Sequence, residues 1–323
     1  MKKDEKIIKE IEELLGKSIP RVGNVGFLKM GVVFDGHDAV DLSLYEGGLS
    51  NLPESIGNLD KLKTLDLSKN KLTTLPESIG NLEKLWSLDI GFNQIKEIPK
   101  SFTGLKSLEN LTITDNQLTI FPESIGKLKK LKELRLSNNQ LTKLPENIGD
   151  LKMIWSLDLD RNNLITIPET IGKLKSLRFL KLNQNKLVSL PESVGNLRSL
   201  TTLYLDNNEI ISIPDPIGNL KKLEELYINT NNQFSVIPDS IGNLESLLKF
   251  AVTNTKLQSI PESIGNLALL NILILFSNQL ITLPETLLNI PNLQMINCQN
   301  NPLDDSAKDI LRQLEKKGVN VLQ

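Results

Sequence analysis

The chain has 323 residues, and its 37 Lys and Arg against 39 Asp and Glu leave a formal charge of −2. A nucleic-acid-binding surface needs a basic footprint, so this balance argues against nucleic acid as a partner. The single cysteine, Cys298, excludes an internal disulfide and favours a reducing compartment, so we expect a cytoplasmic protein. We expect no membrane span and no signal peptide, because no run of 18 apolar residues occurs and the first residues mix charged with apolar side chains.

Residues 1–38 are predicted to form an N-terminal cap. Within residues 4–15, five aliphatic side chains recur at helical spacing and would lie on one face of a helix. The sequence VVFDGHDAVDL follows, and its Asp35-Gly36 pair is typical of a hairpin turn. The hairpin would lead into the first of a series of repeats.

The central part of the chain, residues 39–303, is a repeat array. Prolines recur 23 residues apart, with one step of 24 between Pro214 and Pro238 that indicates a single inserted residue near Asn231 or Asn232. The recurring prolines are Pro53, Pro76, Pro99, Pro122, Pro145, Pro168, Pro191, Pro214, Pro238, Pro261 and Pro284. A unit of this length cannot bury its apolar edge alone, so successive units must stack.

Each repeat contains a Leu-x-Leu pair whose period of two predicts a short strand with both leucines buried. Twelve pairs can be placed in phase, from 42/44 to 296/298, and Val319 with Val321 could add a thirteenth strand. Strands joined by about 20 residues are expected to be parallel, because antiparallel neighbours need only a tight turn. The repeats therefore predict one parallel sheet along the array.

The return path of each repeat reads Pro-Glu-Ser-Ile-Gly or a close variant. Proline suits the start of a helical turn and glycine soon ends it, so we expect single turns, often 3₁₀, on the convex side. A recurrent asparagine lies two residues past the buried strand, where its amide can satisfy backbone groups inside the coil. We predict this structural role for Asn70, Asn93, Asn116, Asn139, Asn162, Asn185, Asn208, Asn278 and Asn301.

These motifs resemble the leucine-rich repeat family, specifically its 23-residue Leu-Pro-x-x-Ile-Gly class, which includes plant intracellular Ras-group proteins, Ras-pathway scaffolds and bacterial or archaeal arrays. The resemblance implies an α/β fold, a right-handed solenoid or horseshoe with a concave parallel sheet of about twelve short strands and convex 3₁₀ or short helical turns. It also implies protein–protein interaction. The flanks are too short for the enzyme domains that some members carry, so a stand-alone array is expected.

Residues 304–323 are predicted to cap the other end of the array. Asp305 or Ser306 can begin a helix that carries Ala307, Ile310, Leu311 and Leu314, and Gly318 can end it. Such a helix would cover the exposed core of the last coil.

The sequence offers little material for catalysis, so we expect a protein that is not an enzyme and holds no cofactor. His37 is the only histidine and lies beside the expected hairpin turn, with no motif for a nucleophile. Cys298 occupies a Leu-x-Leu position, which predicts a buried and inert thiol. Metal-ligand spacing, a phosphate-binding loop and a dinucleotide fingerprint are absent from the sequence.

Side chains that flank the buried strand leucines should form a grid on the concave face, which is acidic overall and carries an apolar group in its second half. The hypothetical partner-binding residues are Phe179, Tyr204, Tyr227, Ile272, Ile274 and Phe276, with Asp158, Asp160 and Asp206 as an acidic rim. Tyr204 and Tyr227 occupy the same site on adjacent coils, so their rings should lie about 5 Å apart. The alternative is ordinary surface variation, and for Trp86 and Trp155 we expect edge packing rather than recognition.

The leading functional hypothesis is a non-catalytic scaffold that binds a protein or peptide with a basic surface on its concave face, and we expect a monomer. Two alternatives stay open. The protein could be a regulatory subunit that docks on a phosphatase or GTPase, or an exported binder of carbohydrate or another surface ligand, although the first residues give no export signal. The sequence does not identify the partner.

Overall fold

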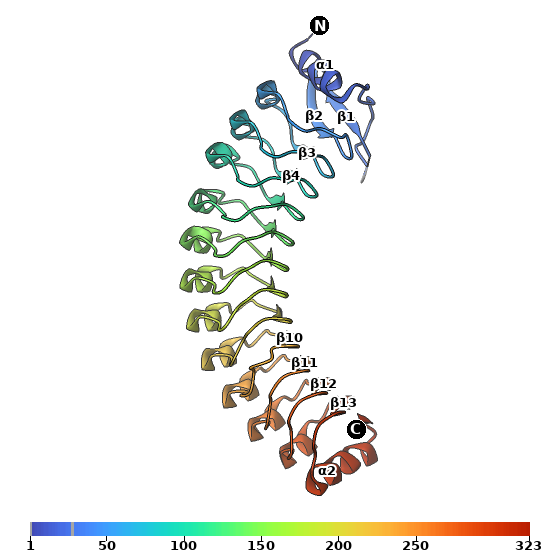
Figure 1. The fold of residues 1–323 in the computed structure, drawn as a ribbon, viewed down its shortest axis with the longest axis vertical. Coiled ribbons are helices and arrows are strands. Elements are labelled where there is room, and N and C mark those ends of the chain that lie inside the picture. The colour runs from blue at the N-terminus through green and yellow to red at the C-terminus, as the bar shows by residue number, and fades with distance from the viewer. Residues whose placement is uncertain (1, 27–28) are drawn as a thin grey trace. The chain divides into compact units, whose positions relative to one another are not determined.

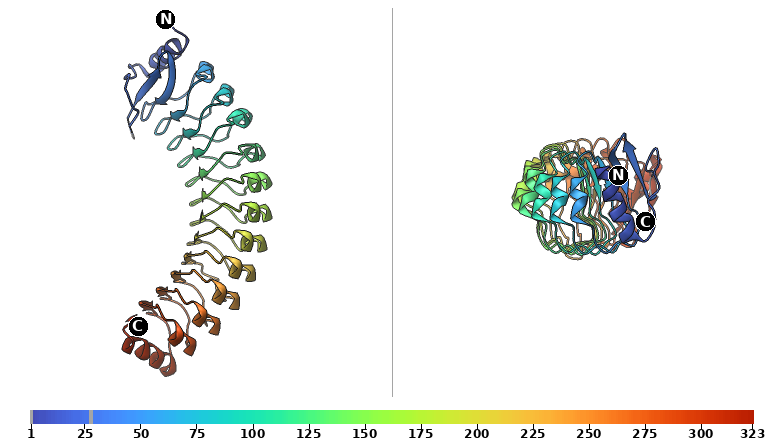
Figure 2. Two further views of the ribbon diagram at one scale, coloured as in Figure 1. Left: turned by 180° about the vertical axis from the view of Figure 1, so that it is seen from behind. Right: turned by 90° about the horizontal axis from the view of Figure 1, so that it is seen from above.

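A computed structural model describes residues 2–26 and 29–323 (Figure 1). The chain divides into two compact units, one ending at Asp158 and one running from Leu159 to Gln323, and each is described by itself. Within each unit, short strands lie on one side and 3₁₀ turns lie on the opposite side (Figures 1 and 2). This is the layered coil that the 23-residue spacing predicts.

The first unit begins with helix α1 (Lys3–Leu15), followed by the antiparallel strands β1 (Gly31–Asp35) and β2 (Asp38–Ser43). Gly36 joins the two strands with a φ of 63°, a left-handed conformation that glycine adopts without strain. The Asp4 carboxylate accepts a hydrogen bond of 2.9 Å from the Ala39 backbone, which ties α1 to β2. Arg21 forms ion pairs with Glu5 and Glu12 of α1 and so fixes the segment that leaves the helix.

The repeats of the first unit add five parallel strands in chain order after β2: β3 (Thr64–Asp66), β4 (Ser87–Asp89), β5 (Asn110–Thr112), β6 (Glu133–Arg135) and β7 (Ser156–Asp158). Its 3₁₀ turns are η1 (Glu54–Asn58), η2 (Glu77–Asn81), η3 (Lys100–Gly104), η4 (Glu123–Lys127) and η5 (Glu146–Asp150). In every strand the middle residue is a buried leucine of the predicted pair.

The second unit repeats the same construction. Its parallel strands are β8 (Phe179–Lys181), β9 (Thr202–Tyr204), β10 (Glu225–Tyr227), β11 (Lys249–Ala251), β12 (Ile272–Ile274), β13 (Met295–Asn297) and β14 (Asn320–Leu322). Its turns are η6 (Glu169–Lys173), η7 (Glu192–Asn196), η8 (Asp215–Asn219), η9 (Asp239–Asn243), η10 (Glu262–Asn266) and η11 (Glu285–Asn289). A thirteenth repeat strand is present as β14, but Val321 pairs with Ile296 where the 23-residue spacing predicts Val319, so its register is shifted by two residues.

The glycine of the Ile-Gly motif serves close packing between turns, which corrects the expectation that it ends each turn. Gly57 lies inside η1, and a Cβ atom on it would come within 2.2 Å of the Ser78 carbonyl oxygen in the next turn. A Cβ atom on Gly195 would likewise come within 2.3 Å of the Pro216 carbonyl oxygen. The preceding proline also lies just outside the turn, because Pro53 has an extended ψ of 149°.

The core of each unit is a stack of aliphatic side chains. Leu65 and Leu67 of one coil and Leu203 and Leu205 of another are almost completely buried, and these positions recur in every repeat. The inserted residue precedes Phe234, one of the largest fully buried side chains. Close-packed aliphatic burial of this extent provides the main favourable free energy for each unit.

The recurrent asparagines hydrogen bond to the backbone inside the coils. The Asn93 amide donates to the carbonyl oxygens of Leu67 and Ile90, both at 3.0 Å, and its oxygen accepts from the Leu72 N–H at 3.0 Å. Asn231, not Asn232, takes this place in its coil and is fully buried. At the irregular position, Thr255 donates its hydroxyl to the Asn278 side chain instead.

Helix α2 (Asp305–Lys316) and β14 end the second unit. Asp304 begins the helix by accepting a hydrogen bond of 2.8 Å from the Ala307 N–H, one residue earlier than the sequence suggests. Ala307, Ile310, Leu311 and Leu314 are buried against the last coil. The helix therefore covers core that the final repeat would otherwise expose.

Candidate binding surface

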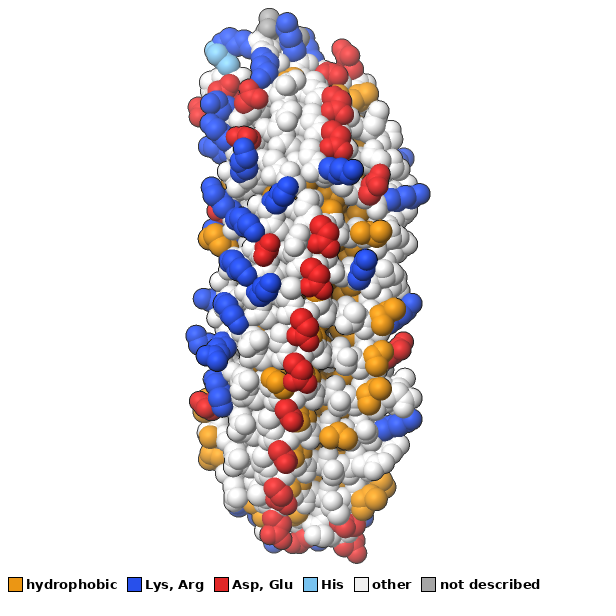
Figure 3. Space-filling view, turned by 90° about the vertical axis from the view of Figure 1, so that its left-hand side faces the viewer, with side chains coloured by type: hydrophobic (Ala, Val, Ile, Leu, Met, Phe, Trp, Pro, Cys, Tyr) orange, Lys and Arg blue, Asp and Glu red, His pale blue; other side chains and the backbone are white. Residues whose placement is uncertain are grey.

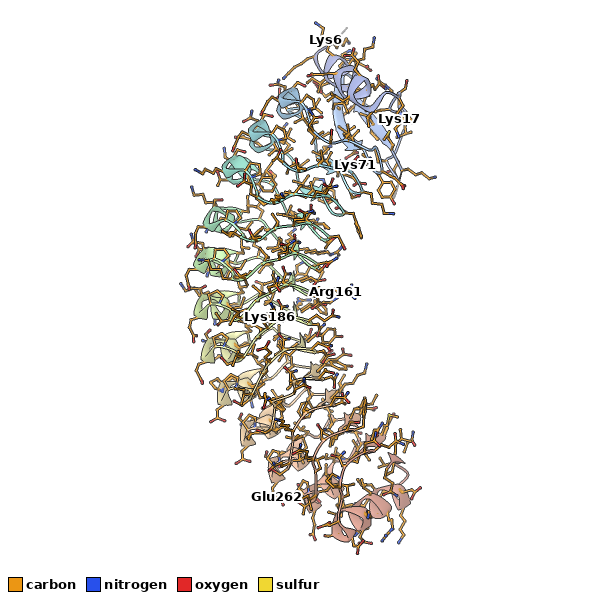
Figure 4. The ribbon with its side chains drawn as sticks, viewed as in Figure 1. Lys6, Lys17, Lys71, Arg161, Lys186 and Glu262 are labelled. Atoms are coloured by element: carbon orange, nitrogen blue, oxygen red, sulfur yellow. The ribbon has the colours of Figure 1, made fainter. Side chains whose placement is uncertain are left out.

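Each unit has two faces with different chemistry. We call the side formed by the first and third residues of each three-residue strand, with Asp41 and Ser43 in register on β2, the strand face; the opposite side, formed by the 3₁₀ turns, is the turn face. In the second unit, Figure 4 shows Arg161 on the side of the strands and Glu262 on the side of the turns. The packing of the repeat fixes the buried residues between the two faces, whereas strand-face side chains are free to vary.

The strand face of the first unit is polar and acidic. Its twelve positions hold five acids, one base and no apolar side chain: Asp41, Ser43, Thr64, Asp66, Ser87, Asp89, Asn110, Thr112, Glu133, Arg135, Ser156 and Asp158. The one base is already engaged, because Arg135 forms an ion pair of 3.0 Å with Glu133. An acidic surface of this kind favours a basic partner through electrostatic complementarity.

The strand face of the second unit is largely apolar and aromatic. Eight of its fourteen positions are apolar or aromatic, against one acid and two bases: Phe179, Lys181, Thr202, Tyr204, Glu225, Tyr227, Lys249, Ala251, Ile272, Ile274, Met295, Asn297, Asn320 and Leu322. Phe179 is 37% exposed, and the two tyrosines, Ile272 and Ile274 are half-buried. Repeat stacking does not require apolar groups at positions that point away from the core.

Tyr204 and Tyr227 meet on adjacent strands β9 and β10. Their ring centroids are 5.0 Å apart, as predicted, but the planes are 89° apart, so the edge of one ring points at the face of the other. The Tyr204 hydroxyl donates a hydrogen bond of 2.8 Å to Glu225, which also accepts one of 2.9 Å from the Lys249 ammonium group. This network fixes the orientation of the pair before any ligand arrives.

The charges of this network follow from its contacts. Burial, together with the hydrogen bond to the Glu225 carboxylate, raises the pKa of Tyr204, and burial also raises the pKa of Tyr227. Burial opposes ionisation of Glu225, but the hydrogen bonds from Lys249 and Tyr204 outweigh it and lower the pKa of this carboxyl. At neutral pH the site therefore presents two neutral phenols beside a paired carboxylate and ammonium group.

Two of the three predicted rim carboxylates are engaged in hydrogen bonds between coils. The Asn183 N–H donates to Asp160 at 2.7 Å, and the Asn229 N–H donates to Asp206 at 2.8 Å. Burial raises the pKa of Asp206. The third, Asp158, is the last residue of the first unit and lies on β7. The carboxylates of Asp160 and Asp206 thus order neighbouring coils, a role that the sequence analysis did not find.

The remaining predicted residues lie farther along the second unit. Ile274 pairs in register with Ala251 of β11, which in turn pairs with Tyr227 of β10. Phe276 follows β12 by two residues and is half-buried. The tyrosines and the β12 residues thus occupy neighbouring strands β9–β12 on one face.

A second exposed apolar group lies on the flank of the second unit. Ile165, Val188, Ile211 and Val236 are 40–57% exposed, and backbone hydrogen bonds such as that from the Ile211 N–H to the Val188 carbonyl oxygen, at 3.2 Å, join their segments. Their only sequence signal is spacing, because three of the four lie two residues before a buried Leu or Ile. They form the main competing candidate for a contact surface in this unit.

The turn face carries a column of acids in each unit (Figure 3). One acid begins nearly every turn, and Lys100 replaces it in η3. The Glu54 and Glu169 carboxylates accept hydrogen bonds from the backbone N–H groups of Ser78 and Ser193, at 3.0 and 3.1 Å. These contacts give the acids a structural role at the start of the following turn.

Other functional groups are sparse in the part of the chain that the structure describes. His37 is exposed in the hairpin turn, and Cys298 is buried, which raises the pKa of its thiol to about 12. Among residues 2–26 and 29–323, no cluster of three or more His, Cys, Asp or Glu side chains could hold a metal ion. Within the same residues, neither helix combines the length and apolar character that a membrane span requires.

Comparison with known families supports the architecture directly. A leucine-rich repeat region model matches residues 41–134 and 169–255, and a second leucine-rich repeat model matches residues 118–164. The first of these models alone matches more than half of the chain. The sequence matches none of the curated proteins with which it was compared.

Several solved structures are similar to this chain. A leucine-rich repeat protein of Leptospira interrogans is 31% identical, with 84% of this chain and 75% of that chain covered and a TM-score of 0.68. The Arabidopsis receptor kinase HAESA, in complex with the peptide hormone IDA and the co-receptor SERK1, is also 31% identical, with 87% of this chain, 50% of that chain and a TM-score of 0.71. An internalin of Listeria monocytogenes, at 22% identity, 98% and 94% coverage and a TM-score of 0.65, shares the fold.

The chain thus spans three quarters of the Leptospira protein and half of the HAESA chain. Its 23-residue register, its parallel strands with opposing 3₁₀ turns and its buried asparagines agree with the family matches. The chain belongs to the leucine-rich repeat family, a fold that generally serves protein–protein interaction.

Proposed function

We propose that the protein is a non-catalytic scaffold in the cytoplasm that binds a protein or peptide on its strand faces. The recognition surface in this proposal is the strand face of the second unit, centred on Tyr204 and Tyr227 and extending over Ile272 and Ile274, together with Phe276 just beyond β12. The acidic strand face of the first unit favours a partner with a basic surface.

One observation carries the proposal: the concentration of apolar and aromatic side chains at strand positions that the fold leaves free. Eight such side chains lie on the strand face of the second unit and none on that of the first. Desolvated aromatic side chains commonly dominate the binding free energy of protein interfaces. The Tyr204–Glu225–Lys249 hydrogen bonds add preorganisation, which lowers the entropy lost on binding.

The similar structures support the same class of function. HAESA was solved with a peptide hormone bound. A FLRT2 leucine-rich repeat domain was solved separately in an octameric complex with Latrophilin 3 and Unc5D. The second of these is 22% identical and supports only the fold. The assignment to the cytoplasm rests on the single buried cysteine, and cell fractionation tests it.

Purification of the tagged full chain from native lysate, followed by mass spectrometry, would identify the partner. The purified partner is then titrated against the parent protein and against the Tyr204→Ala/Tyr227→Ala double variant. We expect the double variant to lose at least about 2 kcal/mol of binding free energy. Equal affinity would place the interface elsewhere.

A matched control is the Ile165→Ala/Val188→Ala variant on the flank, which should bind as the parent does. An enzyme that co-purifies at fixed stoichiometry, and whose activity changes on binding, would instead indicate the alternative of a regulatory subunit. Charge reversal at Asp41 and Asp66 should mainly slow association and weaken its salt dependence, because such acids steer a basic partner toward the surface.

A further inference from the structure

A groove of about 330 Å³ lies in the first unit between Val25 and Gly26 on one side and the strand face of β2–β4 on the other. Val25 and Trp86 contribute apolar surface to it, and Ser43, Asp66 and Asp89 contribute polar groups. Its volume is at the lower end of the range for small-ligand sites, so it suits one long side chain rather than a folded segment.

The indole of Trp86 is the apolar wall of this groove. Trp86 immediately precedes β4 and is 42% exposed, whereas its position just before the strand predicts edge packing. An exposed indole beside carboxylates is the arrangement that attracts a cation over its ring face. Among the described residues that line the groove, none is Lys or Arg.

The two carboxylates of the groove differ in their contacts. Asp66 accepts hydrogen bonds from the Ser68 N–H at 2.9 Å and from the Ser43 hydroxyl at 3.1 Å. Asp89 pairs in register with Asp66 and accepts one hydrogen bond, from the Gly91 N–H at 2.8 Å, within the described residues. No described residue donates to its second oxygen, and burial together with the nearby Asp66 charge raises the pKa of Asp89.

We propose that this groove binds the arginine side chain of a partner protein or peptide, with the guanidinium stacked on Trp86 and hydrogen bonded to Asp89. A guanidinium is planar and carries several N–H donors, so it can stack on the indole and pair with the carboxylate at the same time. An ammonium group is a compact point charge and satisfies the two contacts less well. The inference rests on the proposed function only in taking the partner to be a protein or peptide.

The test uses fluorescence and needs no identified partner. The chain has two tryptophans, so the Trp155→Phe variant leaves Trp86 as the only indole reporter. This variant is titrated with acetyl-Gly-Arg-Gly-amide at constant low ionic strength across the millimolar range. Two further peptides replace the arginine. One carries lysine, and the control peptide carries citrulline, which keeps the shape of arginine without its charge. We expect a saturable change in Trp86 emission with the arginine peptide, a weaker response with the lysine peptide and none with the citrulline peptide.

Two carboxyl variants locate the binding site. Asp89→Asn should weaken arginine-peptide binding at least tenfold, whereas Asp150→Asn, which removes the same charge from η5, should change it less than twofold. Calorimetry on the parent chain repeats the measurement without the Trp155 substitution. An absent saturable signal in both methods, equal responses to the arginine and citrulline peptides, or equal effects of the two Asp variants would overturn the proposal.

Failure here is distinguishable from failure of the proposed function. The groove belongs to the first unit, whereas the tyrosine variants alter β9 and β10 of the second unit. A partner whose affinity depends on Tyr204 and Tyr227 while the arginine peptide fails to bind would leave the scaffold proposal standing and remove only the groove.

Discussion

The two units are built alike inside and differ on their strand faces. In both, an apolar side chain, most often leucine, fills the middle of each repeat strand, an asparagine satisfies the backbone of nearly every coil and a 3₁₀ turn closes it. The strand face carries five acids and no apolar side chain in the first unit, against one acid and eight apolar or aromatic side chains in the second. Positions constrained by packing are therefore uniform, and the unconstrained positions diverge.

This difference separates stability from recognition. A substitution at a buried repeat position should have a similar cost in either unit, because the surroundings are the same. A substitution on a strand face should change stability little and should affect binding according to the chemistry of its own unit.

The largest loss of stability is expected from replacing buried leucines with alanine. Leu136→Ala in the first unit and Leu205→Ala in the second should each lower the free energy of unfolding by about 2–5 kcal/mol, because both side chains are fully buried. Arg135→Ala should cost less than about 1 kcal/mol, since its ion pair is exposed. Urea unfolding measures all three, and a cost for Arg135→Ala equal to that for Leu136→Ala would contradict the strand register.

Removal of a buried asparagine side chain should cause the second-largest loss of stability. Asn208 accepts a hydrogen bond from the Leu187 N–H and donates to the carbonyl oxygens of Leu182 and Leu205. Asn208→Ala leaves these backbone groups unpaired and should cost about 2–3 kcal/mol. The exposed neighbour Glu209 is the control, and thermal unfolding that ranks Glu209→Ala as equally damaging would refute the structural role of Asn208.

Replacement of a turn-face glycine should lower the free energy of unfolding by a smaller amount. Gly57→Ala places a Cβ atom 2.2 Å from the Ser78 carbonyl oxygen, so the two turns must move apart at a cost of about 1–3 kcal/mol. Gly23→Ala is the matched control, because no described atom lies within 4 Å of the new Cβ. If denaturant midpoints show both variants to be equally stable, close packing does not explain the Ile-Gly motif.

The smallest effect concerns Asp89 and depends on pH. Burial, with a contribution from Asp66, raises the pKa of Asp89, so its ionised form is disfavoured in the folded protein. This cost is present above the folded pKa and disappears below the unfolded value of 3.8. Asp89→Asn should therefore be slightly more stable than the parent at pH 7 and equally stable at pH 3. A stabilisation that persists unchanged at pH 3 would exclude ionisation of Asp89 as the cause.

Most of the repeat architecture was predictable, because its signals are local and recur many times. The Leu-x-Leu pairs set the strand register, and the Asp35-Gly36 pair sits at the hairpin turn that joins β1 to β2. The choice between Asn231 and Asn232 needed the structure, since both residues fit the sequence pattern. The role of glycine between turns was missed because it depends on the next coil, which is distant in sequence.

The candidate surface was predictable only as a set of residues on one face. The 5 Å spacing of Tyr204 and Tyr227 follows from strand geometry, but their edge-to-face orientation depends on the hydrogen bond to Glu225 and the support of Lys249. The engagement of Asp160 and Asp206 with Asn183 and Asn229 could not be read from a search for charges. The groove beside Trp86 depends on the placement of Val25 and Gly26, which lie outside the repeats and have no sequence signature.

Side-chain footprinting of the complex by hydroxyl radicals compares the two apolar surfaces of the second unit in one experiment. With the partner recovered by purification bound, Tyr204, Tyr227 and Phe276 should become protected from oxidation, whereas Ile165, Val188, Ile211 and Val236 on the flank should react as in the free protein. Protection of the flank residues with unchanged reactivity of both tyrosines would show that the strand face of the second unit is not the recognition surface.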